Sequence, residues 1–254
     1  MAIELRDLTL GYDGHPAVHH LDGTFADGSL TAIVGPNGSG KSTLLKGITG
    51  ILKPLGGSIE RGATRTRQIA YLPQSAEIDR SFPSTVSDLV ALGHWRSRGL
   101  WGAITGTDYA AVREALEAVG LRGFENRPLD TLSGGQAQRA LFARVMLQDA
   151  DVILLDEPFT AIDEKTTADL IALIRRWHGE KRTVVAVLHD IDMVRQVFPE
   201  ALLMAREPVA WGATAEALKS DNLLKARRMT EAWDEHAAWH DTGHQHSHHR
   251  GHAA

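Results

Sequence analysis

The sequence contains no cysteine, which excludes disulfide bonds and thiolate metal sites. No apolar run approaches the about 18 residues of a membrane-spanning helix, and the longest stretches, such as "TVVAVL", have the length of a strand. The net charge of -5 gives no general excess of positive charge to favour a nucleic-acid partner. The N-terminus, "MAIELRDLTLGYDG", lacks the basic and apolar regions of a signal peptide. We therefore expect a cytosolic protein that binds no nucleic acid and that docks on a membrane-spanning partner if it works at a membrane.

Short apolar stretches alternate with helical patterns along most of the 254 residues. Strands are expected at residues 2–10, 30–34, 68–72, 152–155 and 184–188, and helices at residues 42–48, 137–148, 165–177 and 191–197. This alternation predicts an α/β fold in which helices cover a largely parallel sheet. Only helical patterns occur between residues 84 and about 129, which predicts an inserted helical subdomain at about 75–148. We assign residues 1–230 to the folded domain and residues 231–254 to a flexible tail.

The segment "GPNGSGKST", residues 35–43, fits the phosphate-binding pattern G-x-x-x-x-G-K-[ST] between an expected strand and an expected helix. Glycines allow successive backbone N–H groups to surround a phosphate, and the helix N-terminus adds positive potential. Lys41 is expected to reach the outer phosphates, and the Ser42 hydroxyl to bind Mg²⁺. The alternative, a chance glycine-rich turn, does not account for the strand–loop–helix context. The predicted ATP-binding residues of this loop are Gly35, Pro36, Asn37, Gly38, Ser39, Gly40, Lys41, Ser42 and Thr43.

Two acidic residues follow an apolar strand in "VILLDEP". Open parallel sheets bind ligands at the carboxyl ends of their strands, so Asp156 and Glu157 are expected to face the phosphates. Asp156 suits the oxygen-rich shell of Mg²⁺, and Glu157 suits orienting or deprotonating the attacking water. The alternative is an acidic pair that merely caps a turn before Pro158, and the phosphate-binding loop upstream disfavours it.

The segment "LSGGQ", residues 132–136, follows the phosphate-binding loop and precedes "LLDEP". With these three motifs in this order, residues 3–215 or so resemble the nucleotide-binding domain of an ABC transporter. The resemblance implies a P-loop NTPase core with antiparallel β elements near the N-terminus and an inserted helical subdomain. It implies an ATPase that uses ATP and Mg²⁺.

The signature segment is expected to act on a second copy of the chain. Ser133, Gly134, Gly135 and Gln136 precede the helix expected at 137–148, so a hydroxyl and backbone N–H groups can receive a γ-phosphate. In the family, that phosphate belongs to the nucleotide bound by the opposite subunit. Because the chain carries one set of motifs, the resemblance implies a homodimer that encloses two ATP molecules.

Four further residues match functional positions of the family. Tyr12 in "GYDG" matches the aromatic residue that stacks on adenine, the alternative being a surface tyrosine in a turn. Gln74 in "YLPQ" matches the glutamine that contacts Mg²⁺ and links the site to the helical subdomain. Asp163 in "FTAID" matches an aspartate of the dimer loop. His189 in "VLHD" matches the histidine that contacts the γ-phosphate, although a lone histidine after a strand is more often structural.

Residues 75–95, "SAEIDRSFPSTVSDLVALGHW", resemble the same region of ATPases that serve zinc and manganese importers. In those proteins the region receives a cytoplasmic helix of the membrane permease, which makes Phe82, Pro83 and the expected helix at 86–95 docking candidates. An alternative assigns the apolar residues of that helix to the subdomain core. The resemblance implies a location on the cytoplasmic face of the inner membrane through the permease, with an extracytoplasmic metal-binding protein as an indirect partner.

Seven of the thirteen histidines lie in the last twenty residues: His236, His240, His244, His246, His248, His249 and His252. Imidazole suits zinc, whereas manganese prefers oxygen ligands, so the tail favours zinc as the transported ion. The interrupted "HQHSHH" motif favours weak zinc binding over a purification tag or idle low complexity. The sequence thus predicts the ATPase subunit of a zinc importer; the alternatives are manganese or another cargo, an exporter, and a soluble ABC-type ATPase.

Overall fold

A computed structural model of the chain describes residues 2–62, 69–74, 83–95 and 105–237, with side-chain environments to residue 230. Within these ranges the strands form two sheets. The antiparallel sheet has the order β2-β1-β4 and consists of β1 (Ile3–Tyr12), β2 (His15–Phe25) and β4 (Gly56–Glu60). The larger sheet has the order β5-β6-β7-β3-β8-β9.

Five neighbouring strands of the larger sheet run parallel: β3 (Leu30–Val34), β5 (Ile69–Leu72), β6 (Val152–Asp156), β7 (Thr183–Val187) and β8 (Glu200–Ala205). Strand β9 (Glu207–Ala213) pairs with β8 in the antiparallel direction. Every residue of β3, β6 and β7 is buried, because both faces of the sheet are covered. Ile33 packs in the core beneath the antiparallel sheet, whereas its neighbours Ala32 and Val34 pack in the core on the other face. The predicted α/β fold with a largely parallel sheet is confirmed.

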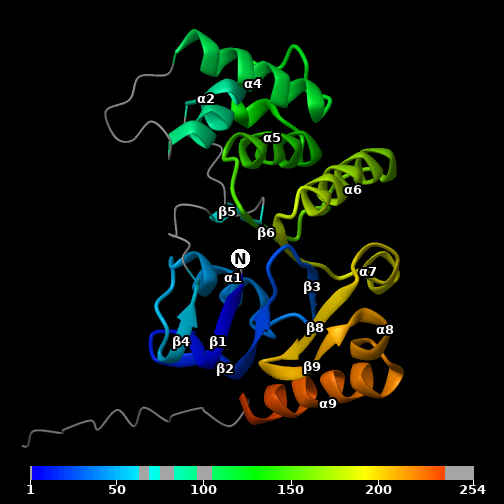
Figure 1. Cartoon of the computed structure of the whole chain (residues 1–254). Coiled ribbons are helices and arrows are strands. Elements are labelled where there is room, and N and C mark those ends of the chain that lie inside the picture. The colour runs from blue at the N-terminus through cyan, green and yellow to red at the C-terminus, as the bar shows by residue number, and fades with distance from the viewer. Residues whose placement is uncertain (1, 63–68, 75–82, 96–104, 238–254) are drawn as a thin grey trace, which may run out of the picture.

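Helices lie in three places (Figure 1). Helix α1 (Lys41–Thr49) contacts β1 and β2 of one sheet and β6 of the other. The helical subdomain lies beyond β5 and contains α2 (Val86–Ala91), the 3-10 turn η3 (Leu92–His94), α4 (Gly106–Ala118), the 3-10 turn η4 (Leu129–Thr131) and α5 (Gly134–Leu147). The remaining helices are α6 (Glu164–Gly179), α7 (Ile191–Val197), α8 (Thr214–Ala217) and α9 (Ser220–Ala237).

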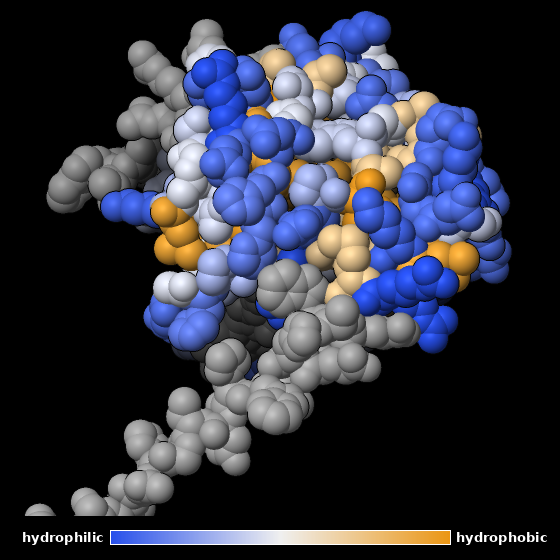
Figure 2. All heavy atoms as spheres, turned by 90° about the horizontal axis from the view of Figure 1, so that it is seen from below, coloured by the Kyte–Doolittle hydropathy of each residue, from blue (hydrophilic) through white to orange (hydrophobic). Residues whose placement is uncertain are grey.

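Helix α9 packs on β8 and β9 through residues at helical spacing. Ala226 is buried, and Leu223 and Met229 are partly buried against the same core. The face seen from below is mainly hydrophilic, with apolar side chains scattered among polar ones (Figure 2). The helix continues to Ala237 and thus crosses residue 230, where we placed the end of the domain; that division stays a prediction. In the part of the chain that the structure describes, no helix combines the length and apolar character that crossing a membrane requires.

Candidate functional site

The phosphate-binding loop connects the end of β3 to the start of α1 and can form only with glycine at two points. Gly35 has φ +156°, and a Cβ there would lie 2.0 Å from the carbonyl oxygen of Met204. Gly40 has φ +88°, and its Cβ would lie 2.5 Å from the carbonyl oxygen of Ala17. Gly40 caps α1 without any side-chain hydrogen bond, and the first turn of α1 contains no acidic residue. The N–H groups at this helix end are therefore suited to an anion.

A cavity of about 400 Å³ lies over this helix end. It is lined by Ala17, Asn37, Gly38, Ser39, Gly40, Lys41, Ser42, Thr43, Gln74 and Glu157. The structure thus brings seven residues of the predicted phosphate-binding loop together with Gln74 and Glu157, which come from distant parts of the sequence. The lining is more polar than apolar, which suits a phosphate chain better than an apolar ligand.

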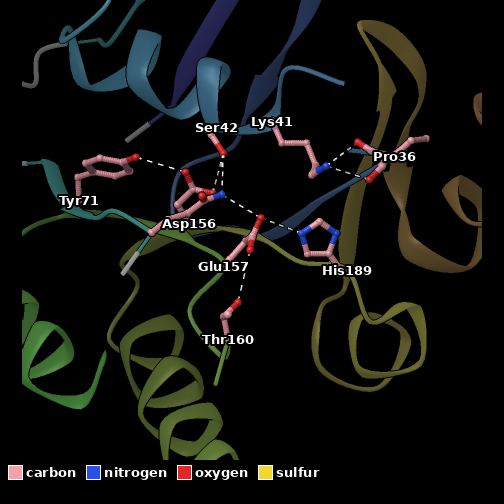
Figure 3. A network of polar contacts seen from close by, with 10 residues as sticks. Pro36, Lys41, Ser42, Tyr71, Asp156, Glu157, Thr160 and His189 are labelled. Carbon is pink, nitrogen blue, oxygen red and sulfur yellow. Dashed lines mark hydrogen bonds and ion pairs between the residues drawn. The ribbon is translucent and has the colours of Figure 1, made fainter. Parts of the chain in front are cut away.

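Lys41 is the cation of this cavity, and its side chain is largely buried. Its Nζ donates hydrogen bonds to the carbonyl oxygens of Gly35, at 2.9 Å, and Pro36, at 2.7 Å (Figure 3). Burial lowers the pKa of Lys41, and the negative charges of Glu157 and Asp156 act in the opposite direction. The two carboxylates therefore help to keep a charged ammonium group inside the loop.

Three oxygen-bearing side chains converge beside Lys41, as a magnesium site requires. The Ser42 hydroxyl donates to Oδ1 of Asp156 at 3.0 Å, and Asp156 is fully buried. Gln74 lies within 3.3 Å of the Ser42 hydroxyl through its Nε2. The hydroxyl and the carboxylate fit Mg²⁺ as they stand, whereas Gln74 fits only if its amide turns to present Oε1 in place of Nε2.

Glu157 is held by polar side chains from three segments (Figure 3). Its Oε1 accepts a hydrogen bond from Nε2 of Gln74 at 2.9 Å and lies 2.8 Å from Nε2 of His189. The Thr160 hydroxyl donates to Oε2 at a longer 3.4 Å. Glu157 itself has φ +48°, a backbone conformation that costs energy in a residue with a side chain and is often found at functional sites. Glu157 after β6 and His189 after β7 thus contact each other at the carboxyl ends of two neighbouring strands.

The signature segment lies elsewhere in the same chain. We expected its glycines to precede the helix; the structure instead places Gly134 and Gly135 in the first turn of α5, because Ser133 is the N-cap. The Ser133 side chain accepts from the backbone N–H of Gln136 at 3.2 Å, and the Gln136 side chain accepts from the backbone N–H of Ser133 at 3.0 Å. This reciprocal cap fixes where the helix begins. These four residues do not line the cavity of their own chain.

The predicted dimer loop packs against the signature segment. A Cβ on Gly135 would lie 2.8 Å from the carbonyl oxygen of Ala161, which itself has φ +60°. Asp163 caps α6 by accepting hydrogen bonds from the backbone N–H of Thr166, at 2.9 Å, and from its hydroxyl, at 2.8 Å. These bonds lower the pKa of Asp163, and nearby Arg139 adds to the effect. The loop therefore presents an ionised, exposed carboxylate next to the signature segment.

Replacing Gly135 with alanine should impair this contact. The added methyl group meets backbone rather than a mobile side chain, so the Ala161 loop must shift. We expect the free energy of unfolding to fall by about 1–3 kcal/mol. ATP turnover should fall about tenfold or more, because small displacements of a reacting group are costly. Thermal unfolding and phosphate release measure the two effects.

Gly179→Ala is the matched control, because Gly179 also lies in a helix and a Cβ there meets nothing within 4 Å. It should leave turnover unchanged and stability equal or slightly higher. Equal behaviour of the two variants would contradict the role assigned to the Gly135–Ala161 contact.

Tyr12 lies away from the cavity, some predicted residues lie outside the described part of the chain, and two relevant residues were missed. Tyr12 is 48% exposed and does not line the cavity, so its stacking role stays a prediction. Phe82 and the tail histidines from His240 onward lie outside the described residues, and so do the side chains from residue 231. Sequence reasoning missed Tyr71, whose hydroxyl contacts Asp156, and Thr160, which contacts Glu157. Both lie within or beside motifs, but only tertiary structure shows what they contact.

A family model described as "ABC transporter" matches residues 18–160. A probable metal transport system ATP-binding protein of Chlamydia pneumoniae is 38% identical over 225 residues, which are 87% of each chain. A zinc transport system ATP-binding protein of Treponema pallidum is 37% identical over 89% of this chain and 86% of its own. A manganese transport system ATP-binding protein of Synechocystis sp. is 36% identical over 88% of this chain and 91% of its own.

Solved structures share the fold over nearly the same length. An inward-facing transporter proposed to be of the metal-chelate ABC type superposes with a TM-score of 0.77 at 29% identity, covering 89% of both chains. A dimeric ATP-binding cassette with bound ADP and phosphate superposes with a TM-score of 0.75 at 25% identity, covering 84% of this chain and 98% of the other. The arrangement of sheets and helices in this chain is therefore the one found in these cassettes.

Proposed function

The chain belongs to the ABC transporter family, and from this premise we propose that it is the ATP-hydrolysing subunit of a zinc importer. Its ATPase domain and its ATP-binding character follow from the family. The ion, the direction of transport and the residue roles are our proposal. The observation that carries it is the group of polar side chains over the N-terminus of α1, where Lys41, Gln74 and Glu157 meet.

We assign the roles within this group as follows. The loop backbone and Lys41 bind the β- and γ-phosphates, and Ser42, Asp156 and Gln74 hold Mg²⁺. When bound, Mg²⁺ supplies positive charge to the phosphate oxygens. Glu157 orients the attacking water and accepts its proton, since its carboxylate is at the cavity wall. His189 exchanges its contact with Glu157 for one with the γ-phosphate.

The proposed active form is a homodimer. Ser133 and the glycines that follow it do not line the cavity of their own chain, which supports a role at the nucleotide of a second copy. The similar cassette with bound ADP and phosphate is dimeric, which adds support. In this form the N–H groups at the start of α5 and the Ser133 hydroxyl would contact the γ-phosphate, and Asp163 would lie at the interface.

The proposed permease-docking surface is on the helical subdomain. Val86, Leu89 and Val90 are buried, which favours the alternative that they belong to the subdomain core. Leu92 is 48% exposed and Trp95 55% exposed at the end of the same segment, so they replace the helix as a whole as docking candidates, together with Pro83. Docking there would hold the chain at the cytoplasmic face of the inner membrane. An extracytoplasmic metal-binding protein would then deliver the ion to the permease.

Zinc is the proposed cargo, and manganese is the second candidate. Relatives named for zinc and for manganese transport are about equally similar to this chain, at 37% and 36% identity. The histidine-rich end of the sequence supports zinc, because imidazole nitrogen is a common zinc ligand and manganese prefers oxygen. We propose that His244, His246, His248 and His249 bind zinc weakly.

A strain that lacks the chain tests the cargo by its growth in medium depleted of zinc alone or of manganese alone. We expect a growth defect in zinc-depleted medium that the full-length chain rescues and Glu157→Gln does not. A chain that ends at Ala237 tests the histidines and keeps α9 whole, which a cut at residue 230 would not.

A defect confined to manganese-depleted medium would contradict zinc as the cargo and keep the importer. If the strain that lacks the chain grows as well as its parent in both media, import of either metal is contradicted. Equal rescue by the shortened chain would separate the tail from the transport function.

A further inference from the structure

Tyr71 reaches the predicted magnesium site from the edge strand of the larger sheet. It lies on β5, which pairs with β6 in parallel so that Tyr71 is opposite Leu154. From there its hydroxyl donates to Oδ2 of Asp156 at 3.3 Å (Figure 3). Neither the phosphate-binding loop nor the acidic pair contains this residue, and it does not line the cavity.

The carboxylate that receives this bond needs orienting groups. Asp156 is fully buried, and a buried carboxylate is stable only with hydrogen bonds or opposite charge around it. Its Oδ1 accepts from Ser42 and its Oδ2 from Tyr71, so each oxygen is held by a hydroxyl from a different element. An ionised carboxylate has about four acceptor positions, so it can accept such hydrogen bonds and also bind a cation.

The position of Tyr71 is itself fixed. Arg144 on α5 donates through Nη2 to the backbone carbonyl oxygen of Tyr71 at 3.0 Å, which ties β5 to the helix that begins at the signature segment. The ring packs against the core beneath the antiparallel sheet. The hydroxyl therefore approaches Asp156 from a rigid part of the molecule.

We propose that Tyr71 is a positioning residue that orients Asp156 for Mg²⁺ through its hydroxyl. This inference rests on the proposed role of Asp156 as a magnesium ligand. Tyr71 touches neither nucleotide nor metal in this assignment and acts only through the carboxylate. Because 3.3 Å is long for an O–H···O contact, the effect of losing it is a few-fold rather than hundreds-fold.

Tyr71→Phe tests the proposal because it removes the hydroxyl and keeps the ring. The dissociation constant of a fluorescent ATP analogue is measured on the full chain with Mg²⁺ and again with EDTA. The value in EDTA divided by the value in Mg²⁺ gives the contribution of the metal. We expect Tyr71→Phe to reduce this ratio about three- to tenfold and to leave the value in EDTA unchanged. Tyr109→Phe is the matched control, since Tyr109 is 44% exposed on α4, and it should leave both values unchanged.

Asp156→Asn separates the proposed magnesium role of Asp156 from the positioning role of Tyr71. A reduced ratio in Asp156→Asn with a wild-type ratio in Tyr71→Phe would overturn the role of Tyr71 alone. A wild-type ratio in Asp156→Asn would overturn the magnesium assignment and the inference with it. Weaker binding of Tyr71→Phe in EDTA, or a thermal midpoint well below that of Tyr109→Phe, would make Tyr71 a structural residue and would also overturn the proposal.

Discussion

Replacing Glu157 with glutamine should lower the rate of ATP hydrolysis at least about 100-fold while ATP binding is kept. The amide has the shape of the carboxylate but cannot accept a proton from water at neutral pH. Glu157 is the carboxylate at the cavity wall that Gln74 and His189 both contact, at 2.9 and 2.8 Å. Phosphate release under saturating ATP measures turnover, and titration with a fluorescent ATP analogue measures binding.

The same variant tests the homodimer. If hydrolysis separates the two copies, a chain that binds ATP without hydrolysing it should accumulate as a dimer in ATP and Mg²⁺, which sedimentation velocity detects. Glu117→Gln is a suitable control, because Glu117 is exposed on α4 and pairs with Arg122 away from the cavity. Turnover at the wild-type rate in Glu157→Gln would remove Glu157 from its role. A slow enzyme that stays monomeric in ATP would keep the role and contradict the dimer.

The sequence predicts most of the parallel sheet because its strands are short apolar runs that end at polar loops. Strands β3, β6 and β7 lie within a residue of their expected positions, since burial on both faces leaves only apolar side chains there. Helices α6 and α7 also match, because each presents one apolar face. A local sequence pattern is enough to predict an element that is buried on both faces or along one face throughout its length.

Strand β1 lies close to the strand expected at residues 2–10, whereas its partner β2 and strands β8 and β9 were missed. The register between β1 and β2 shifts after Leu5, and His20 in β2 adopts a positive φ, so β2 is not a regular strand. Strands β8 and β9 are joined at Arg206, which has φ +64° where glycine or asparagine would signal a turn. The helix expected at 86–95 is instead α2 followed by a 3-10 turn.

In the candidate site, too, some residues could be predicted from local sequence and others only from the tertiary structure. Lys41, Asp156 and Glu157 belong to contiguous motifs whose chemistry can be predicted from the residues themselves. The bonds from Tyr71 to Asp156 and from Thr160 to Glu157 depend on strand pairing and on the turn after β6, which no local pattern encodes. The contact between Gln74 and Glu157 joins residues 83 positions apart. Such contacts follow only from the assembled fold.

Replacing Lys41 with alanine should weaken ATP binding about 10- to 100-fold, which distinguishes it from Glu157→Gln, where binding is kept. Lys41 carries the positive charge of the cavity, and its Nζ already lies inside the loop, 2.9 Å from the carbonyl oxygen of Gly35. Alanine removes a charged donor to phosphate in a partly desolvated site, where such a bond is stronger than in water. Titration with the fluorescent ATP analogue in Mg²⁺ measures the loss.

The variant also removes a cation from beside two carboxylates, so its stability must be measured together with its affinity. Glu157 and Asp156 both favour the charged form of Lys41, and without it their mutual repulsion is less compensated. We therefore expect a lower thermal midpoint, and binding is measured below it, where circular dichroism shows a folded chain. Lys53→Ala, at an exposed position after α1, should change neither quantity. Wild-type affinity in folded Lys41→Ala would contradict the phosphate-binding role, because the variant lacks the positive charge that is proposed to bind the phosphates.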